Sequence, residues 1–133
     1  QRRLERFGVR ASVLLTGLIW GVWHAPIVAQ GHNYPGHAAL GVPLFIVFCV
    51  VWSVILGWLR NASGSVWAPT IAHASMNGPA VAPMMLVKGA NVLVASFVGV
   101  IGIVLAGLFA AYLLSAGLIR RPVDQPPVCE TES

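Results

Sequence analysis

The chain alternates between long apolar runs and short polar breaks. Its four runs cover residues 11–28, 40–59, 66–87 and 92–119. Each run approaches or exceeds the roughly 20 residues that a helix needs to cross about 30 Å of hydrocarbon. Backbone polar groups inside lipid must bond to one another, so each run is predicted to be helical. The pattern therefore predicts an all-α fold, a polytopic membrane helix bundle with four transmembrane helices.

The polar breaks and the last residues divide the chain further. Residues 1–119 hold all four runs and are predicted to form one core. Residues 120–133 carry three prolines and three acids and lack an apolar stretch. Such a segment cannot bury enough surface to fold, so we expect a disordered cytoplasmic tail.

Composition narrows the class of protein. Hydrophobic residues make up 57% of the chain and charged residues only 9%, whereas soluble domains carry about 25% charged residues. Such a chain is neither a soluble globular domain nor a disordered one. Its net charge of +4 does not indicate a nucleic-acid partner. We expect membrane lipid to surround it.

The basic residues indicate the orientation of the spans. Lys88 lies on one side of the predicted membrane. The other seven basic residues lie on the opposite side: Arg2, Arg3, Arg6, Arg10, Arg60, Arg120 and Arg121. Cytoplasmic loops are enriched in Lys and Arg. The pattern predicts an integral, multi-pass protein of a bacterial plasma membrane with both ends in the cytoplasm.

Two histidines are the candidate functional residues. No Asp, Glu, Lys or Arg lies within the four runs, but His24 lies in the first and His73 in the third. They follow Arg10 and Arg60 by 14 and 13 residues, or about 21 and 20 Å of helix. In the four-span topology they lie at similar depth, and Asn77 follows His73 by one turn. Polar groups inside a membrane are functional candidates by default.

These residue types suit a hydrolytic site. Neutral imidazoles bind zinc and similar divalent metals, so His24 and His73 are candidate metal ligands and catalytic residues. The Asn77 amide is able to donate to a developing oxyanion. The spans supply no carboxylate as a general base. An alternative is structural, because membrane histidines often only bond across a helix interface.

Other residues add less specific signals. Trp20 and Trp23 are candidates for a substrate pocket, because a bulky ring beside Gly17 and Gly21 leaves room for an apolar ligand. The same glycines are spaced for close helix packing. His32 and His37 lie in the polar break at residues 30–37, where we expect a solvated loop with no assigned role.

Two motifs resemble those of a known family. The stretch from Gly17 to Pro26, with Trp20 and His24 four residues apart, looks like the second signature of the CPBP family. His73 and Asn77 resemble its third signature, His-x-x-x-Asn. The family comprises type II CAAX prenyl endopeptidases and bacteriocin-processing enzymes, which are intramembrane metalloproteases. The resemblance covers about residues 1–108, and Trp20 stands where Phe is usual.

The resemblance implies a partial site. The family's first signature, Glu-Glu-x-x-x-Arg, is absent, and the chain looks as if it begins just past it. By resemblance, those glutamates supply the general base and complete the metal site. His24 and His73 then contact the metal or catalytic water, and Asn77 helps hold the oxyanion. We expect the chain alone to be inactive, its partners being that upstream segment and a membrane-associated protein or peptide substrate.

Two other functions stay open on the sequence. His24 and His73 are also suited to bind a haem as two axial ligands, although Asn77 then has no role. The chain is otherwise a non-catalytic membrane scaffold or immunity protein, in which case replacing either histidine leaves function intact. The leading hypothesis is the partial core of an intramembrane metalloendopeptidase acting on prenylated or bacteriocin-type substrates.

Overall fold

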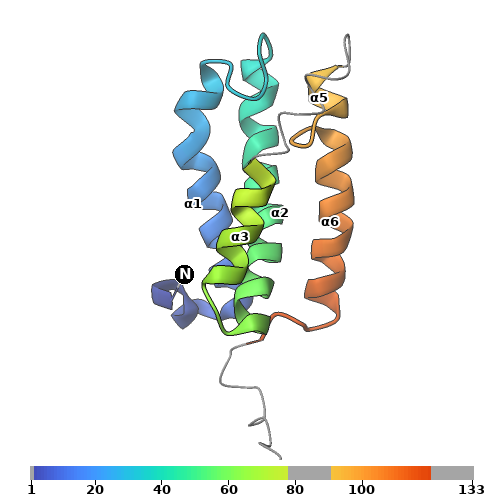
Figure 1. The fold of residues 1–133 in the computed structure, drawn as a ribbon. Coiled ribbons are helices and arrows are strands. Elements are labelled where there is room, and N and C mark those ends of the chain that lie inside the picture. The colour runs from blue at the N-terminus through green and yellow to red at the C-terminus, as the bar shows by residue number, and fades with distance from the viewer. Residues whose placement is uncertain (1, 78–90, 121–133) are drawn as a thin grey trace, which may run out of the picture.

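The computed structural model describes residues 2–77 and 91–120. Its elements are the 3-10 helix η1 (Arg2–Phe7) and the α-helices α1 (Val9–Ala29), α2 (Ala38–Ser63), α3 (Trp67–Asn77), α5 (Val92–Ala95) and α6 (Val100–Ser115). The helices lie alongside one another in a bundle (Figure 1). The predicted all-α bundle is confirmed within these residues.

Among the described residues, three segments are long and apolar enough to cross a membrane: Val9–Ala29, Ala38–Ser63 and Val92–Ser115. They correspond to the first, second and fourth predicted spans. The described part of the predicted third span is α3, and residues 78–87 of that span lie outside the described residues. The predicted tail also lies outside them, apart from Arg120.

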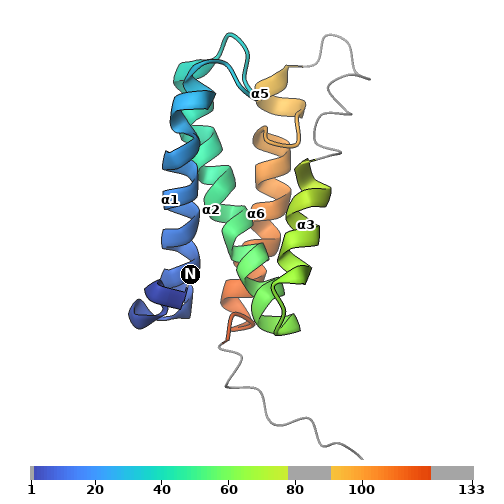
Figure 2. The same ribbon diagram turned by 60° about the vertical axis from the view of Figure 1, so that its left-hand side comes forward.

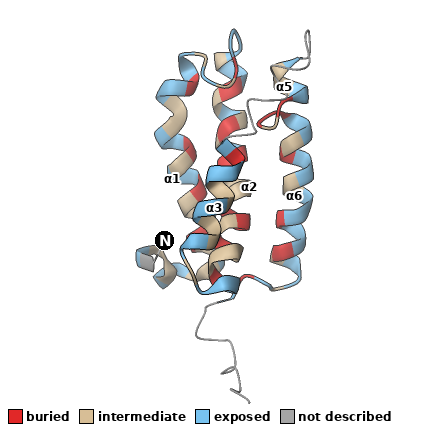
Figure 3. Ribbon diagram, in the orientation of Figure 1, coloured by how far each residue is buried: buried red, intermediate tan, exposed pale blue. Residues whose placement is uncertain are grey.

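The outer surface of the bundle is apolar. Exposed and intermediate positions cover the outward faces of the helices, and buried positions gather between them (Figure 3). Trp23, Trp67 and Leu108 expose 75%, 70% and 66% of their surface. An apolar surface of this kind is stable against lipid and not against water. The chain is an integral membrane protein.

Helix α2 is the centre of the bundle, because it contacts α1, α3 and α6 (Figure 2). Its closest neighbour is α1, where Gly17 and Gly21 are buried against it. A methyl group on Gly17 would lie 2.5 Å from Val50 Cα, and one on Gly21 would lie 2.8 Å from Ile46 Cα. The two backbones therefore approach as closely as the glycine spacing predicts.

The fourth predicted span differs from expectation in its first turns. Instead of one helix over 92–119, α5 ends at Ala95 and α6 begins at Val100. The backbone of Ser96 is extended, and its hydroxyl donates to the Val92 carbonyl at 2.7 Å. The break frees the carbonyl of Val98 to accept a hydrogen bond from the hydroxyl of Tyr34. This bond joins the α1–α2 loop to the α5–α6 turn.

Candidate active site

Helix α1 fixes the ring of His24 by a local hydrogen bond. Its Nδ1 lies 2.9 Å from the backbone oxygen of Trp20, one turn earlier in the helix. A carbonyl oxygen only accepts, so Nδ1 carries the hydrogen and donates it. In the neutral ring, Nε2 then keeps its lone pair and is the atom that is able to bind a metal or accept a proton. The other tautomer would lose this bond.

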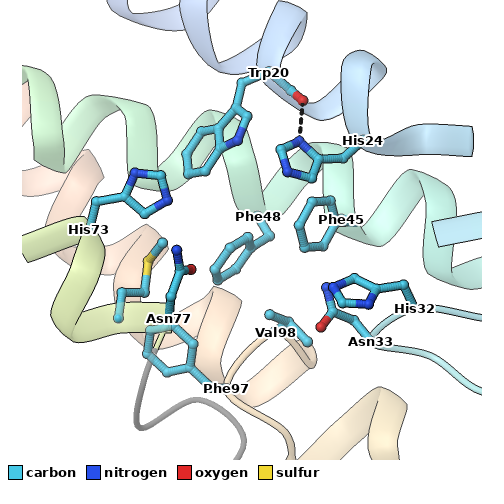
Figure 4. A pocket seen from close by; sticks show the side chains of 11 residues that line it. Trp20, His24, His32, Asn33, Phe45, Phe48, His73, Asn77, Phe97 and Val98 are labelled. Atoms are coloured by element: carbon cyan, nitrogen blue, oxygen red, sulfur yellow. Dashed lines mark hydrogen bonds between the residues drawn. The ribbon is translucent and has the colours of Figure 1, made fainter. Parts of the chain in front are cut away.

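Trp20 lies between the two predicted imidazoles. Its ring centroid is 6.0 Å from that of His24 and 5.2 Å from that of His73 (Figure 4). His24 and Trp20 belong to α1, whereas His73 belongs to α3. The structure therefore brings both histidines to one place, with an indole as their common neighbour.

His24, His73, Asn77 and Trp20 all line one cavity of about 300 Å³. Asn77 is one turn beyond His73 on α3, so both side chains reach the same face of the helix. Small-molecule sites in proteins typically start near 300 Å³ and combine an apolar wall with a few polar groups. This cavity fits that description.

Aromatic rings from α2 and the α5–α6 turn form the apolar wall. The ring of Phe45 lies 5.4 Å from that of His24 and 5.5 Å from that of Phe48. Phe48 in turn meets Phe97 edge-on, with centroids 5.7 Å apart. The imidazoles of His24 and His73, both partly buried, thus lie beside an aromatic wall.

Trp23, the second predicted pocket residue, does not line this cavity. It is 75% exposed on the outer surface of α1, and only the edge-on contact of its ring, 4.7 Å from His24, connects it to the site. Trp23 directly precedes His24, and adjacent helix residues point about 100° apart, so Trp23 is turned away from the face that carries His24. Of the two predicted pocket residues, the structure brings Trp20 alone to the cavity.

The α1–α2 loop contributes two residues that sequence reasoning did not assign to the site. His32 and Asn33 line the cavity opposite His73 (Figure 4). Asn33 has a left-handed backbone with φ of +66°, which Asn tolerates better than most residues. His37 is exposed and does not line the cavity. His32 is exposed, as expected for a solvated loop, and Asn33 is partly buried; both nevertheless line the cavity.

Tyr34 holds this loop in place. Its side chain is completely buried and donates a hydrogen bond to the Val98 carbonyl. Desolvation by burial, followed by the nearby Cys49 thiol, raises the pKa of the phenol well above its ordinary value. The hydroxyl is thus a neutral donor over the physiological pH range. A Tyr in the middle of a polar break was the sequence signal that the loop packs inward.

The residues fit a metal ion only in part. Three imidazoles line the cavity, those of His24, His32 and His73, and the tautomer of His24 suits a ligand. Within residues 2–77 and 91–120, however, no three His, Cys, Asp or Glu side chains are grouped closely enough to hold a metal. Catalytic zinc sites use three protein ligands and a water. The described residues supply a maximum of two of these ligands.

Comparison with known families gives an identification. Residues 1–79 match the family described as type II CAAX prenyl endopeptidase Rce1-like. The match covers more than half of the 133 residues, and the chain belongs to this family. The matched residues include His24, His73 and Asn77. The family implies an intramembrane protease of the CAAX type. No curated protein and no solved structure matches the chain.

Proposed function

We propose that this chain forms the catalytic cavity of an intramembrane metalloendopeptidase that cleaves peptide bonds of membrane-associated substrates. One observation carries the proposal: His24 and His73, from two different helices, line a single cavity together with Asn77. Imidazoles and an amide beside an aromatic wall suit amide hydrolysis, because fixed donors are able to stabilise the charge that develops there.

Each side chain has a distinct role in this proposal. The Nε2 atom of His24 orients the attacking water or binds the metal, and its Nδ1–H bond to Trp20 keeps it in that tautomer. His73 holds the water or metal from the opposite helix. The Asn77 amide donates a hydrogen bond to the oxyanion of the tetrahedral intermediate.

A divalent metal, for which we propose zinc, polarises the substrate carbonyl or lowers the pKa of bound water when present. His24 and His73 are its proposed ligands. The residues that line the described cavity include no carboxylate. We propose that a Glu-bearing segment outside the described residues supplies the remaining ligand and the general base, and that the 133-residue chain alone is inactive or nearly so.

We also propose the surroundings and the substrates. The ends of the bundle support cytoplasmic termini: a methyl group on Gly117, just after α6, would lie 3.9 Å from the Arg10 guanidinium at the start of α1, so both ends are on one basic side. The protein is proposed to be bacterial and to lie in the plasma membrane. Its proposed substrates are lipid-anchored or membrane-inserted proteins and peptides, of prenylated or bacteriocin type.

The test uses the complete protein, with any Glu-bearing segment, in proteoliposomes with a lipidated peptide substrate. His24→Ala and His73→Ala are expected to lower kcat/KM by at least roughly a thousandfold, and Asn77→Ala by roughly a hundredfold, as for loss of an oxyanion donor. His37→Ala is the matched control, because that histidine is exposed and outside the cavity. Histidine variants as active as this control would contradict the proposal.

A second measurement separates the roles. Removing metal with a chelator and restoring zinc is expected to abolish and recover activity in the wild type. Purified protein is expected to show no visible absorption band, whereas a Soret band that disappears in His24→Ala would favour the haem alternative.

Activity of the 133-residue chain equal to that of the complete protein would contradict the proposed external carboxylate.

A further inference from the structure

A third imidazole, that of His32, lines the candidate active-site cavity together with those of His24 and His73. It comes from the α1–α2 loop, on the side of the cavity opposite His73 (Figure 4). Of the described residues that line this cavity, these three histidines are the ones able to gain or lose a proton near neutral pH. The proposed function gives roles to His24 and His73 and leaves His32 without one.

The end of α1 fixes the backbone of His32. Gly31 has a left-handed backbone, with φ of +96°, and its N–H donates to the Val28 carbonyl at 2.9 Å. The N–H of His32 donates to the Ile27 carbonyl at 3.3 Å. These two bonds form a Schellman motif, which closes a helix at a left-handed residue. The backbone of His32 is therefore fixed relative to the helix that carries His24.

The side chain of His32 is available to a substrate. Among the described residues, its ring makes no hydrogen bond and no ring contact with His24 or His73. It is exposed as well as lining the cavity, so it is able to exchange protons with solvent. Two residues later, the bond from Tyr34 to the Val98 carbonyl holds the loop against the α5–α6 turn. An uncommitted imidazole is thus held at the edge of the cavity.

Amide hydrolysis requires a proton donor as well as a base. The nitrogen leaves as a neutral amine when it takes up a proton as the C–N bond breaks, and a positioned side chain is able to supply that proton. His24 is poorly suited to this step, because the hydrogen of its neutral ring is bonded to the Trp20 carbonyl. His73 and Asn77 have the proposed roles of holding the water or metal and the oxyanion. His32 is the remaining titratable group among the described residues of the cavity.

We propose that His32 is the general acid that protonates the leaving nitrogen. This inference rests on the proposed peptidase function and deepens it. As the tetrahedral intermediate breaks down, an electron pair of the oxyanion re-forms the C=O bond, and the electron pair of the C–N bond passes to the nitrogen. The nitrogen takes a proton from the imidazolium of His32, which becomes neutral. The products are a carboxylic acid and an amine, and His32 takes its next proton from solvent.

A change of leaving group tests this role. An S-prenylated peptide is compared with its depsipeptide, in which an ester oxygen replaces the nitrogen of the bond to be cleaved. An alkoxide leaves with much less help from an acid than an amide nitrogen does. In the complete protein, His32→Gln is expected to lower kcat for the amide by roughly a hundredfold or more, as for loss of a general acid. The same variant is expected to cleave the ester within a few-fold of the wild type, with KM for both substrates little changed.

His37→Gln is the matched control, because His37 is an exposed histidine of the same loop that does not line the cavity. It is expected to keep both activities. The ester activity of His32→Gln also reports whether that variant is folded with its cavity intact. The ratio of amide to ester hydrolysis therefore separates loss of a proton donor from a disturbance of the loop, which lowers both rates together.

Two results overturn the inference while the peptidase function stands. One is an equal loss of amide and ester hydrolysis in His32→Gln, which assigns His32 a positioning role. The other is amide hydrolysis by His32→Gln at the rate of the His37→Gln control. A wild type that cleaves neither substrate contradicts the proposed peptidase function, and the role of His32 falls with it. The two failures are thus distinguishable.

Discussion

The imidazole of His73 on α3 packs against the indole of Trp20 on α1, with ring centroids 5.2 Å apart and the planes tilted by 58°. This contact joins two helices that are separated in the chain by the whole of α2. Both residues also line two cavities, the candidate active-site cavity and a second one of about 280 Å³.

Replacing Trp20 tests this relationship. Trp20→Phe keeps an aromatic ring against His73 and is expected to retain activity within a few-fold. Trp20→Ala merges the cavities and frees His73, and a misplacement of about 1 Å costs roughly a hundredfold in rate. The measurement is kcat/KM of the complete protein. Trp67→Ala, which removes a 70% exposed indole on α3, is the control, and an equal loss there would contradict the prediction.

Gly17→Ala tests the close approach of α1 and α2. The added methyl group would lie 2.5 Å from Val50 Cα and 2.8 Å from the Cys49 carbonyl oxygen, both backbone atoms. The helices must separate, and we expect a loss of about 1–3 kcal/mol in the free energy of unfolding in detergent. Gly107→Ala is the control, because its nearest contact is 4.0 Å away. Equal stability of the two variants would rule out the steric argument.

Tyr34→Phe tests the bond that anchors the α1–α2 loop. The variant leaves the buried Val98 carbonyl without its donor, which is expected to lower the free energy of unfolding by about 1–3 kcal/mol. The exposed Tyr112 on α6 gives the matched control, Tyr112→Phe, with little expected change. Because the loop carries His32 and Asn33, we also expect faster amide hydrogen exchange there in Tyr34→Phe, and unchanged exchange would contradict the anchoring role.

The same tyrosine predicts a dependence of stability on alkaline pH. Burial raises the pKa of Tyr34 above its ordinary value of 10.0. Below pH 10 the phenol is neutral in both states, so its contribution is complete. Above pH 10 the unfolded state ionises first, and stability falls by up to about 1.4 kcal/mol per pH unit. Unfolding followed from pH 9 to 11 is expected to show a slope that is smaller in Tyr34→Phe; identical slopes would refute it.

The sequence was sufficient where the signal is local. Apolar runs predict helices because lipid leaves the backbone no other partner. The similar depths of His24 and His73 followed from a fixed rise per residue. Asn77 was predicted to lie beside these histidines because it follows His73 by four residues, and residues four apart lie on one face of a helix.

The sequence was insufficient where distant parts of the chain meet. Tyr34 and Val98 are 64 residues apart, and their bond joins the α1–α2 loop to the break in the fourth apolar run. No periodicity reports such a contact. His32 and Asn33, which line the cavity, lie in the loop that this bond holds. The outward position of Trp23 was, by contrast, available from its place directly before His24, because adjacent helix residues point about 100° apart.

Gly17 and Gly21 give α1 and α2 a spacing that is set by main-chain atoms, whereas α3 buries only Met76. One half of the site is thus rigid and the other is held by side chains. A lineage that diverges toward new peptides is able to remodel α3 by single substitutions while His24 stays fixed. Substitutions that change the substrate are then expected to gather in α3, whereas Gly17 and Gly21 are expected to remain unchanged.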